Sequence, residues 1–192
     1  MRISRTVVLL VLIGLGSAGA ATAQSVDVFF GLNAITAHDA TASINPYPRF
    51  GGGLFPSVGA DVMLLHTFGV GAEFTYRQQN NYQNSPRLSY YDVNAIWMPF
   101  HLPFLTPEIQ IGLGSAHLKA YQNLFASCNG AANCLNVAAA NHLTGHVGAG
   151  LRINLVHGLF LRPEAHFYFI RNSRTAARAA QRFGVSLGYT FG

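Results

Sequence analysis

Two cysteines are the residues best suited to covalent chemistry in this sequence of 192 residues. Cys128 and Cys134 lie in a stretch of small and polar residues, with the turn formers Asn129 and Gly130 between them. Two cysteines without a neighbouring histidine or acid make a poor zinc site. We therefore expect a disulfide between Cys128 and Cys134, which an exported chain would form in an oxidising compartment and which would stiffen an exposed loop.

A serine and a histidine raise the question of nucleophilic catalysis. Ser115 and His117 would share one face of a strand, but a serine nucleophile needs a histidine that an acid orients. No acid lies on that face, the other histidines are scattered, and no glycine-rich phosphate loop or paired-carboxylate motif stands out. The sequence therefore favours a protein that is not an enzyme and that has no cofactor or metal site, with a lipid-modifying enzyme as the least favoured alternative.

Buried ion pairs are the third kind of chemistry that the spacing indicates. Arg152 and Arg162 lie equally far from a turn centred on His157, so they should face each other on neighbouring strands. Two adjacent arginines are unfavourable unless acids interleave with them. Glu108 and Glu164 should lie at about the same height along their strands as the two arginines. This predicts a cluster of Glu108, Arg152, Arg162 and Glu164. Such a cluster would brace a protein interior, or alternatively act as a gate for small ions or protons.

Arginines near the C-terminus suggest contacts with lipid. Arg171, Arg174 and Arg178 fall in or beside a polar loop, where they could bind the phosphates of lipid headgroups. Alternatively, the long loops around residues 35–54 and 121–141 could bind a surface ligand.

The elements that must position these residues are strands, because apolar and polar residues alternate with period two. In residues 182–191, Phe183, Val185, Leu187, Tyr189 and Phe191 alternate with polar residues and glycine. The same pattern predicts strands at 25–34, 56–65, 70–77, 87–97, 105–121, 143–154, 161–169 and 182–191. Short turns near residues 66–68, 99–103 and 156–158 alternate with long loops near 35–54, 79–86, 121–141 and 172–178. This asymmetry is typical of an all-β, eight-stranded antiparallel up-and-down transmembrane β-barrel.

The distribution of charge separates this barrel from a soluble one. Only 10% of the residues are charged, against about 25% in a typical soluble domain. Six of the seven acids alternate with the apolar residues and so share the opposite face: Asp27, Asp61, Glu73, Asp92, Glu108 and Glu164. Aromatic residues gather at strand ends, with Phe68, Trp97, Phe104, Phe160 and Phe191 beside short turns and Tyr76, Tyr90, Tyr91, Tyr121 and Phe169 beside long loops. An apolar face turned outward to lipid explains both features better than a lipocalin-like barrel with an apolar cavity.

The N-terminal segment has the order of a secretory signal peptide. Arg2 and Arg5 precede an apolar run at residues 7–15, and small residues end at Ala23. We predict cleavage after Ala23, so that residues 1–23 are the signal peptide and residues 24–192 are the barrel domain. The apolar run is shorter than the roughly 20 residues that a spanning helix needs. Because the chain is exported and only mildly basic, nucleic acid is not an expected partner.

Over the whole of residues 24–192, this pattern resembles the small eight-stranded outer-membrane barrels of the OmpA/OmpX type. The segment with Arg182, Gly184, Leu187, Tyr189 and Phe191 resembles the C-terminal signal that the barrel-assembly machinery reads, although Gly192 follows where members usually end on an aromatic residue. The resemblance implies a monomer in the bacterial outer membrane, with lipopolysaccharide and the assembly machinery as partners. It implies a structural or surface-interaction role with an interior plugged by salt bridges, or alternatively a narrow channel for small solutes or ions.

Overall fold

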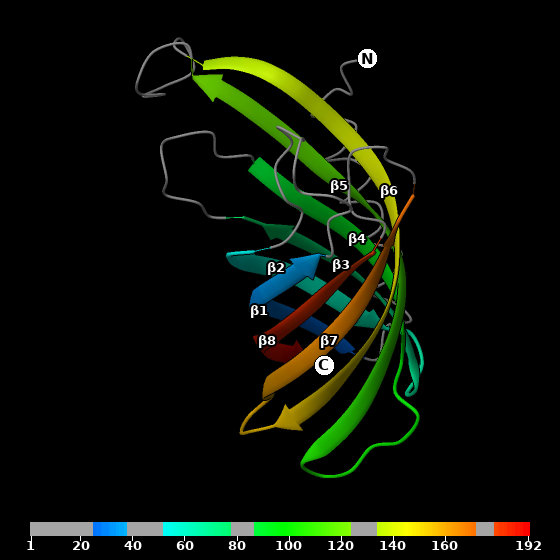
Figure 1. Ribbon diagram of the computed structural model, residues 1–192. Coiled ribbons are helices and arrows are strands. Elements are labelled where there is room, and N and C mark those ends of the chain that lie inside the picture. Colours follow the sequence, from blue (N-terminus) through cyan, green and yellow to red (C-terminus); the bar gives the residue numbers. More distant parts are fainter. Residues whose placement is uncertain (1–24, 38–51, 78–86, 124–133, 172–178) are drawn as a thin grey trace, which may run out of the picture.

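Eight antiparallel strands close into one barrel in the computed structural model, which describes residues 25–37, 52–77, 87–123, 134–171 and 179–192 (Figure 1). Each strand pairs with the next in the chain, and β1 pairs with β8 to complete the closure. The strands are β1 (Ser25–Ala37), β2 (Leu54–Met63), β3 (Phe68–Tyr76), β4 (Arg87–Trp97), β5 (Leu105–Asn123), β6 (Cys134–Asn154), β7 (Leu159–Ile170) and β8 (Ala179–Phe191). The predicted fold class, an up-and-down antiparallel barrel, is confirmed. No helix among the described residues is long and apolar enough to cross a membrane.

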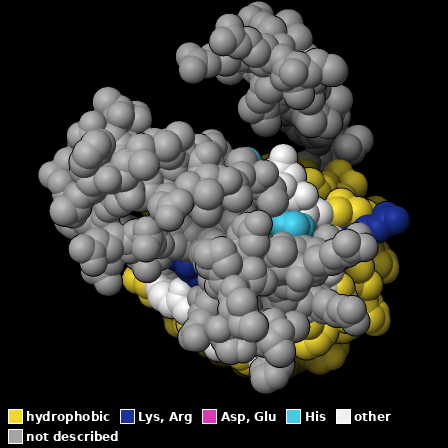
Figure 2. Space-filling view, turned by 45° about the horizontal axis from the view of Figure 1, so that its top comes forward, with side chains coloured by type: hydrophobic (Ala, Val, Ile, Leu, Met, Phe, Trp, Pro, Cys, Tyr) yellow, Lys and Arg dark blue, Asp and Glu magenta, His cyan; other side chains and the backbone are white. Residues whose placement is uncertain are grey.

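The alternation along each strand sorts side chains between the inside and the outside of the barrel. In β1, Asp27, Phe29 and Asn33 are buried while Val28 and Phe30 between them are exposed. Exposed large hydrophobic side chains come from all eight strands, and they dominate the part of the barrel wall that is coloured in Figure 2. The buried set includes all six acids that the alternation assigns to the inner face. Polar groups inside and apolar groups outside are the reverse of the arrangement in a water-soluble protein.

The two ends of the barrel differ in the length of their connections. At one end, here called the turn side, β6 and β7 are joined by a tight turn in which His157 and Gly158 take positive φ angles of 51° and 83°. That geometry matches the twist of a two-residue hairpin. The opposite end, here called the loop side, carries the longer connections.

The β5–β6 hairpin shows the largest departure from the predicted strand ends. Strands β5 and β6 pair up to Asn123 and Cys134, beyond the rim formed by their neighbours (Figure 1). Much of the predicted long loop at 121–141 is therefore strand. The register shifts between Ala120 and Tyr121, and this irregularity breaks the period-two pattern on which the prediction depended.

Most of the predicted interfacial aromatic residues lie on the outer surface, but two lie inside. Phe68 and Trp97 are exposed at the turn side and stack with ring centroids 6.3 Å apart. Phe160 and Tyr90 are instead buried in the barrel. Each falls in the inward phase of its own strand, so proximity to a strand end was a weaker guide than the alternation.

The buried side chains of the interior lie in layers. On the loop side, an apolar cluster, here called the loop-side cluster, comprises Ile35, Phe55, Leu88, Tyr90, Ala116, Tyr168, Ile170 and Ala180. A smaller apolar cluster of Met63, Ile96 and Met98 lies on the turn side. The charged residues lie between the two clusters and toward the turn-side mouth.

Candidate functional site: the charged interior of the barrel

Three arginines on consecutive strands form the charged layer. Arg152 on β6, Arg162 on β7 and Arg182 on β8 all point inward, and all three are buried. Because a buried guanidinium needs partners for its charge and its donors, each arginine organises its own set of acceptors.

Arg162 lies at the centre and binds three carboxylates. Its Nη1 lies 2.8 Å from an oxygen of Asp61 and 3.1 Å from an oxygen of Glu108, and its Nε lies 3.2 Å from an oxygen of Glu164. The guanidinium carbon lies 4.2 Å from the centre of the Phe29 ring, which adds a cation–π contact. The acids come from β2, β5 and β7, so this one side chain ties together distant parts of the barrel wall.

Arg182 extends the network toward the loop side through a shared acid. Its Nη2 lies 2.8 Å from Glu73 and 3.2 Å from Glu164, which also binds Arg162. Its Nη1 donates a hydrogen bond of 3.3 Å to Thr75. The two arginines together therefore face four carboxylates, namely Asp61, Glu73, Glu108 and Glu164.

Arg152 does not join the predicted cluster. Its guanidinium pairs with Asp27 and donates to the hydroxyl of Thr190, while its Nε donates to Asn154 over 3.2 Å. It also lies over the ring of Phe160, 4.0 Å from the centroid. The structure thus brings Glu108, Arg162 and Glu164 together and places Arg152 apart from them.

Arg152 lies apart from the predicted cluster because the closure of the barrel gives it a different partner. The β6–β7 register sets Gly150 opposite Glu164 and Ile153 opposite Leu161, so Arg152 and Arg162 are neighbours along the wall as expected. Their like charges favour opposite directions for the two side chains. Arg152 reaches Asp27 on β1, a partner 125 residues away that becomes available only when β1 and β8 pair.

Two histidines on the loop side of Arg162 form the least satisfied part of the interior. The rings of His146 and His166 are buried with centroids 5.2 Å apart, and none of their four nitrogens has a hydrogen-bond partner among the described residues. Asp92 lies 3.8 Å from His146, and Glu164 lies 3.7 Å from His166. Glycines make room for the rings, since a Cβ at Gly112 or Gly148 would overlap His146 or His166 respectively.

The loop-side cluster lies above these histidines. Tyr168 spans the boundary, because its hydroxyl donates to Asp92 over 2.9 Å while its ring packs 5.6 Å from that of Tyr90. The ring of Phe55 lies 6.4 Å from that of Tyr90 in an edge-on contact. The arrangement can therefore hold the wall together both through charge and through aromatic packing.

Other predicted sites lie partly outside the described residues. Cys128, Arg174, Arg178 and the cleavage position after Ala23 fall there, so the disulfide and the signal peptide remain predictions. Cys134 is the first residue of β6, and Arg171 is exposed at the loop-side end of β7.

Within the part of the chain that the structure describes, no acid contacts the predicted serine–histidine pair. His117 Nδ1 contacts the side-chain oxygen of Asn141 on β6 rather than a carboxylate. Among the described residues, no group of three or more His, Cys, Asp or Glu side chains is arranged to hold a metal ion.

The alternation of polar and apolar residues predicts that most residues of the charged network point inward, but it does not predict which acid binds which arginine. Asp61 and Asp27 were recognised as inward acids, yet nothing in the alternation pairs them with Arg162 or Arg152. The signal that could have found them is the stagger between strands, which shifts partners along the barrel axis.

Comparison with known proteins supports the fold. No protein-family model matches the chain, and no curated protein sequence matches it. Among solved structures, the N-terminal β-barrel domain of Pseudomonas aeruginosa OprF is similar at a TM-score of 0.60 and 13% identity, over 88% of this chain and 98% of that one. Neisserial surface protein A is similar at a TM-score of 0.61 and 10% identity, over 87% and 96% of the two chains. The attachment invasion locus protein Ail of Yersinia pestis is similar at a TM-score of 0.52 and 14% identity, over 87% and 97%. The chain therefore has the fold of the small eight-stranded outer-membrane β-barrels.

Proposed function

We propose that this protein is a monomeric barrel of the bacterial outer membrane, closed to solutes, with a structural or surface-interaction role. The observation that supports the proposal is the set of buried side chains inside the barrel: the network of Arg162 and Arg182 and the loop-side cluster lie in the lumen at successive heights. Eight strands leave an interior just wide enough for side chains to fill. A protein of this design acts through its outer surface and its loops.

The location in a membrane is supported by the apolar outer face. Val93 on β4 and Leu113 on β5 are 65% and 68% exposed, and they lie directly opposite each other in the β4–β5 register. A continuous apolar belt of this kind is costly in water and favourable in lipid. The predicted signal peptide at residues 1–23 provides the route of export, and barrel-assembly machinery would insert the exported chain.

Fractionation tests this location. Folded membrane barrels resist detergent until heated, so the protein should be found in outer-membrane extracts and its gel band should shift after boiling. A soluble periplasmic protein whose band does not shift would overturn the proposal and would point instead to a barrel that carries a lipid.

A narrow channel is the second candidate, and the two buried histidines whose nitrogens have no hydrogen-bond partner among the described residues favour it. Buried polar atoms without protein partners, such as those of His146 and His166, are the kind that ordered water satisfies. A file of water past these rings would conduct protons or small ions if it crossed the loop-side cluster.

Conductance measurements separate the two candidates. In planar bilayers the native protein should show no discrete conductance steps, and vesicles that contain it should hold a proton gradient as well as empty vesicles do. Tyr168→Ala, which removes a ring from the loop-side cluster, should increase the leak. Discrete steps or a proton leak in the native protein would establish the channel and refute the closed interior.

Lipopolysaccharide is the proposed partner of the loop-side arginines. Arg171 is exposed at the end of β7, where a cation can meet headgroup phosphates. Replacing Arg171, Arg174 and Arg178 together with Gln should weaken lipopolysaccharide association, and the native interaction should weaken with rising salt. If the triple variant binds as the native protein does, surface-ligand binding through the loops becomes the better account, and replacing the β1–β2 and β5–β6 loops would test it.

A further inference from the structure

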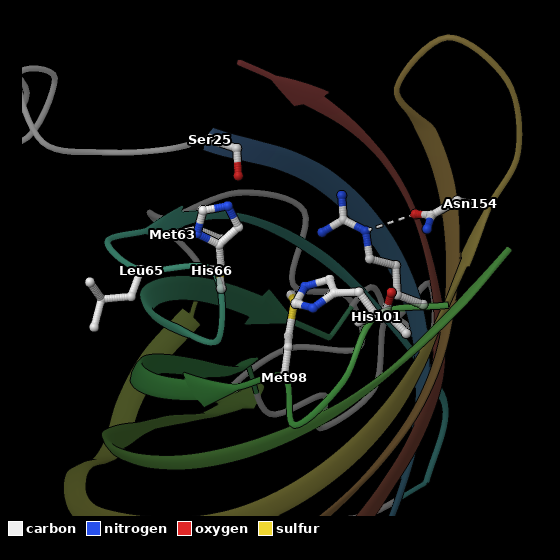
Figure 3. A pocket seen from close by; sticks show the side chains of 9 residues that line it. Ser25, Met63, Leu65, His66, Met98, His101 and Asn154 are labelled. Carbon is white, nitrogen blue, oxygen red and sulfur yellow. Dashed lines mark hydrogen bonds between the residues drawn. The ribbon is translucent and has the colours of Figure 1, made fainter. Parts of the chain in front are cut away.

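The turn-side mouth of the barrel contains a cavity of about 300 Å³ that the closed-barrel role does not use. Its lining includes Met63, His66, Met98 and His101, and Figure 3 shows the two imidazoles and the thioether of Met98 around one hollow. Met63 ends β2, His66 lies in the β2–β3 connection, and Met98 and His101 lie in the neighbouring β4–β5 connection. This set of side chains, here called the Met–His set, differs in kind from the acids and arginines of the network.

Methionine is concentrated at this mouth. The chain has three methionines, and the two that follow the predicted signal peptide are Met63 and Met98. Both are buried, and they pack in one cluster with Ile96. Thioether sulfur is polarizable and soft, so two of them at one cavity form a site of defined chemical character.

The backbone holds the two connections together. The N–H of Met98 donates to the carbonyl of Thr67 over 2.8 Å, which ties the residue next to His66 to the segment that leads to His101. Leu64 and Leu65 both donate to the carbonyl of Phe68 over 3.0 Å, so the β2–β3 turn is itself hydrogen-bonded. The imidazoles are therefore carried by braced turns, although they are exposed to solvent.

From this juxtaposition we infer that the Met–His set binds a soft monovalent metal ion, Cu(I) or its analogue Ag(I). Thioether ligands select Cu(I), and imidazole is a good ligand for copper. Among the described residues that line the cavity, the oxygen donors are the neutral side chains of Ser25, Thr106 and Asn154, and none is the carboxylate with which proteins usually bind Mg²⁺ or Ca²⁺. The site would keep soft metal ions at the turn side of the barrel.

Arg152, which also lines the cavity, does not turn it into an anion site. Its Nη1 and Nη2 are engaged by Asp27, Nη2 also donates to Thr190, and its Nε donates to Asn154. The pairing with Asp27 offsets its positive charge within the same contact. An anion would have to compete with these partners, whereas a soft cation needs only the thioether and imidazole side chains that line the cavity.

Methionine-methyl NMR tests the inference directly. The full chain, carrying Cys128→Ser and Cys134→Ser so that thiols do not compete for silver, is labelled with ¹³C-methyl methionine and titrated with silver nitrate in chloride-free detergent micelles. Only Met63 and Met98 report on the cavity, and Met1, where it is retained, serves as an internal reference. Both cavity signals should shift and saturate with one equivalent of silver.

Matched variants separate binding at the cavity from nonspecific binding. His66→Gln with His101→Gln should weaken silver binding by at least about tenfold, the loss that even a partner outside the coordination shell causes. His157→Gln, an exposed histidine on the β6–β7 turn that does not line the cavity, should leave the affinity unchanged. Met63→Leu and Met98→Leu keep the side-chain volume, and each should remove one responding signal and weaken binding while the heat-dependent gel shift persists.

Three outcomes would overturn the inference. Methionine signals that do not respond to silver would exclude the thioethers as ligands. Unchanged affinity in His66→Gln with His101→Gln would show that the imidazoles take no part. A response of the cavity to phosphate or acetate but not to silver would make it an anion site.

Discussion

Removing the central guanidinium should destabilise the barrel strongly. Arg162→Met keeps a long unbranched side chain but leaves Asp61, Glu108 and Glu164 without the cation that lies 2.8 to 3.2 Å from them. Arg162 is only 1% exposed, so water cannot replace the lost interactions without entering the lumen. Breaking a buried ion pair by removing one partner costs about 3–5 kcal/mol of unfolding free energy. We expect a loss in that range.

The single tryptophan makes the assay simple. Trp97 is 43% exposed on the outer face near the turn side, so its fluorescence should change as the barrel leaves lipid. Urea unfolding of native protein and Arg162→Met in lipid vesicles gives the difference in free energy. Arg171→Met is the matched control: the same replacement at an exposed position should change stability by no more than about 0.5 kcal/mol.

A double-mutant cycle identifies the interaction responsible. Asp61→Asn removes one of the carboxylates that Arg162→Met leaves unpaired, so the double variant should be more stable than the sum of the single effects predicts, by about 0.5–3 kcal/mol. The reasoning is refuted if Arg162→Met unfolds with the same free energy as Arg171→Met. Strict additivity in the cycle would show instead that the loss comes from packing rather than from charge.

Three further predictions test the wall, the interior and the loop. Val93→Arg, on the outer face near the middle of β4, should cost about 2–4 kcal/mol in lipid vesicles; near-neutrality would indicate a barrel surrounded by water. Gly148→Ala should destabilise by about 1–3 kcal/mol because the new Cβ overlaps a buried imidazole, whereas Gly145→Ala, whose Cβ would meet only ordinary contacts, should be neutral or slightly stabilising. Oxidised protein should run faster than reduced protein on a gel, and Cys128→Ser with Cys134→Ser should abolish the difference; equal mobility in the native protein would argue against the disulfide.

Period-two alternation was enough to determine the class of fold. Phe183, Val185 and Leu187 predicted an outward apolar face, and that face is exposed in β8. The same rule placed Asp61 and Glu73 inside. This information is local, because successive side chains of a strand point to opposite faces whatever the strand pairs with. The rule missed residues 134–142 of β6, which pair with β5 on both sides of the shift of register between Ala120 and Tyr121.

Only the closed tertiary structure decided which charges meet. Arg152 and Arg162 were correctly placed on adjacent strands. Arg152 nevertheless binds Asp27, because β8 pairs with β1 and so brings β1 close to β6. The cavity at the turn side likewise depends on two connections that lie far apart in the sequence, at His66 and His101. Contacts across a barrel are set by strand stagger and closure. These are properties of the whole sheet and cannot be predicted from the sequence of any single strand.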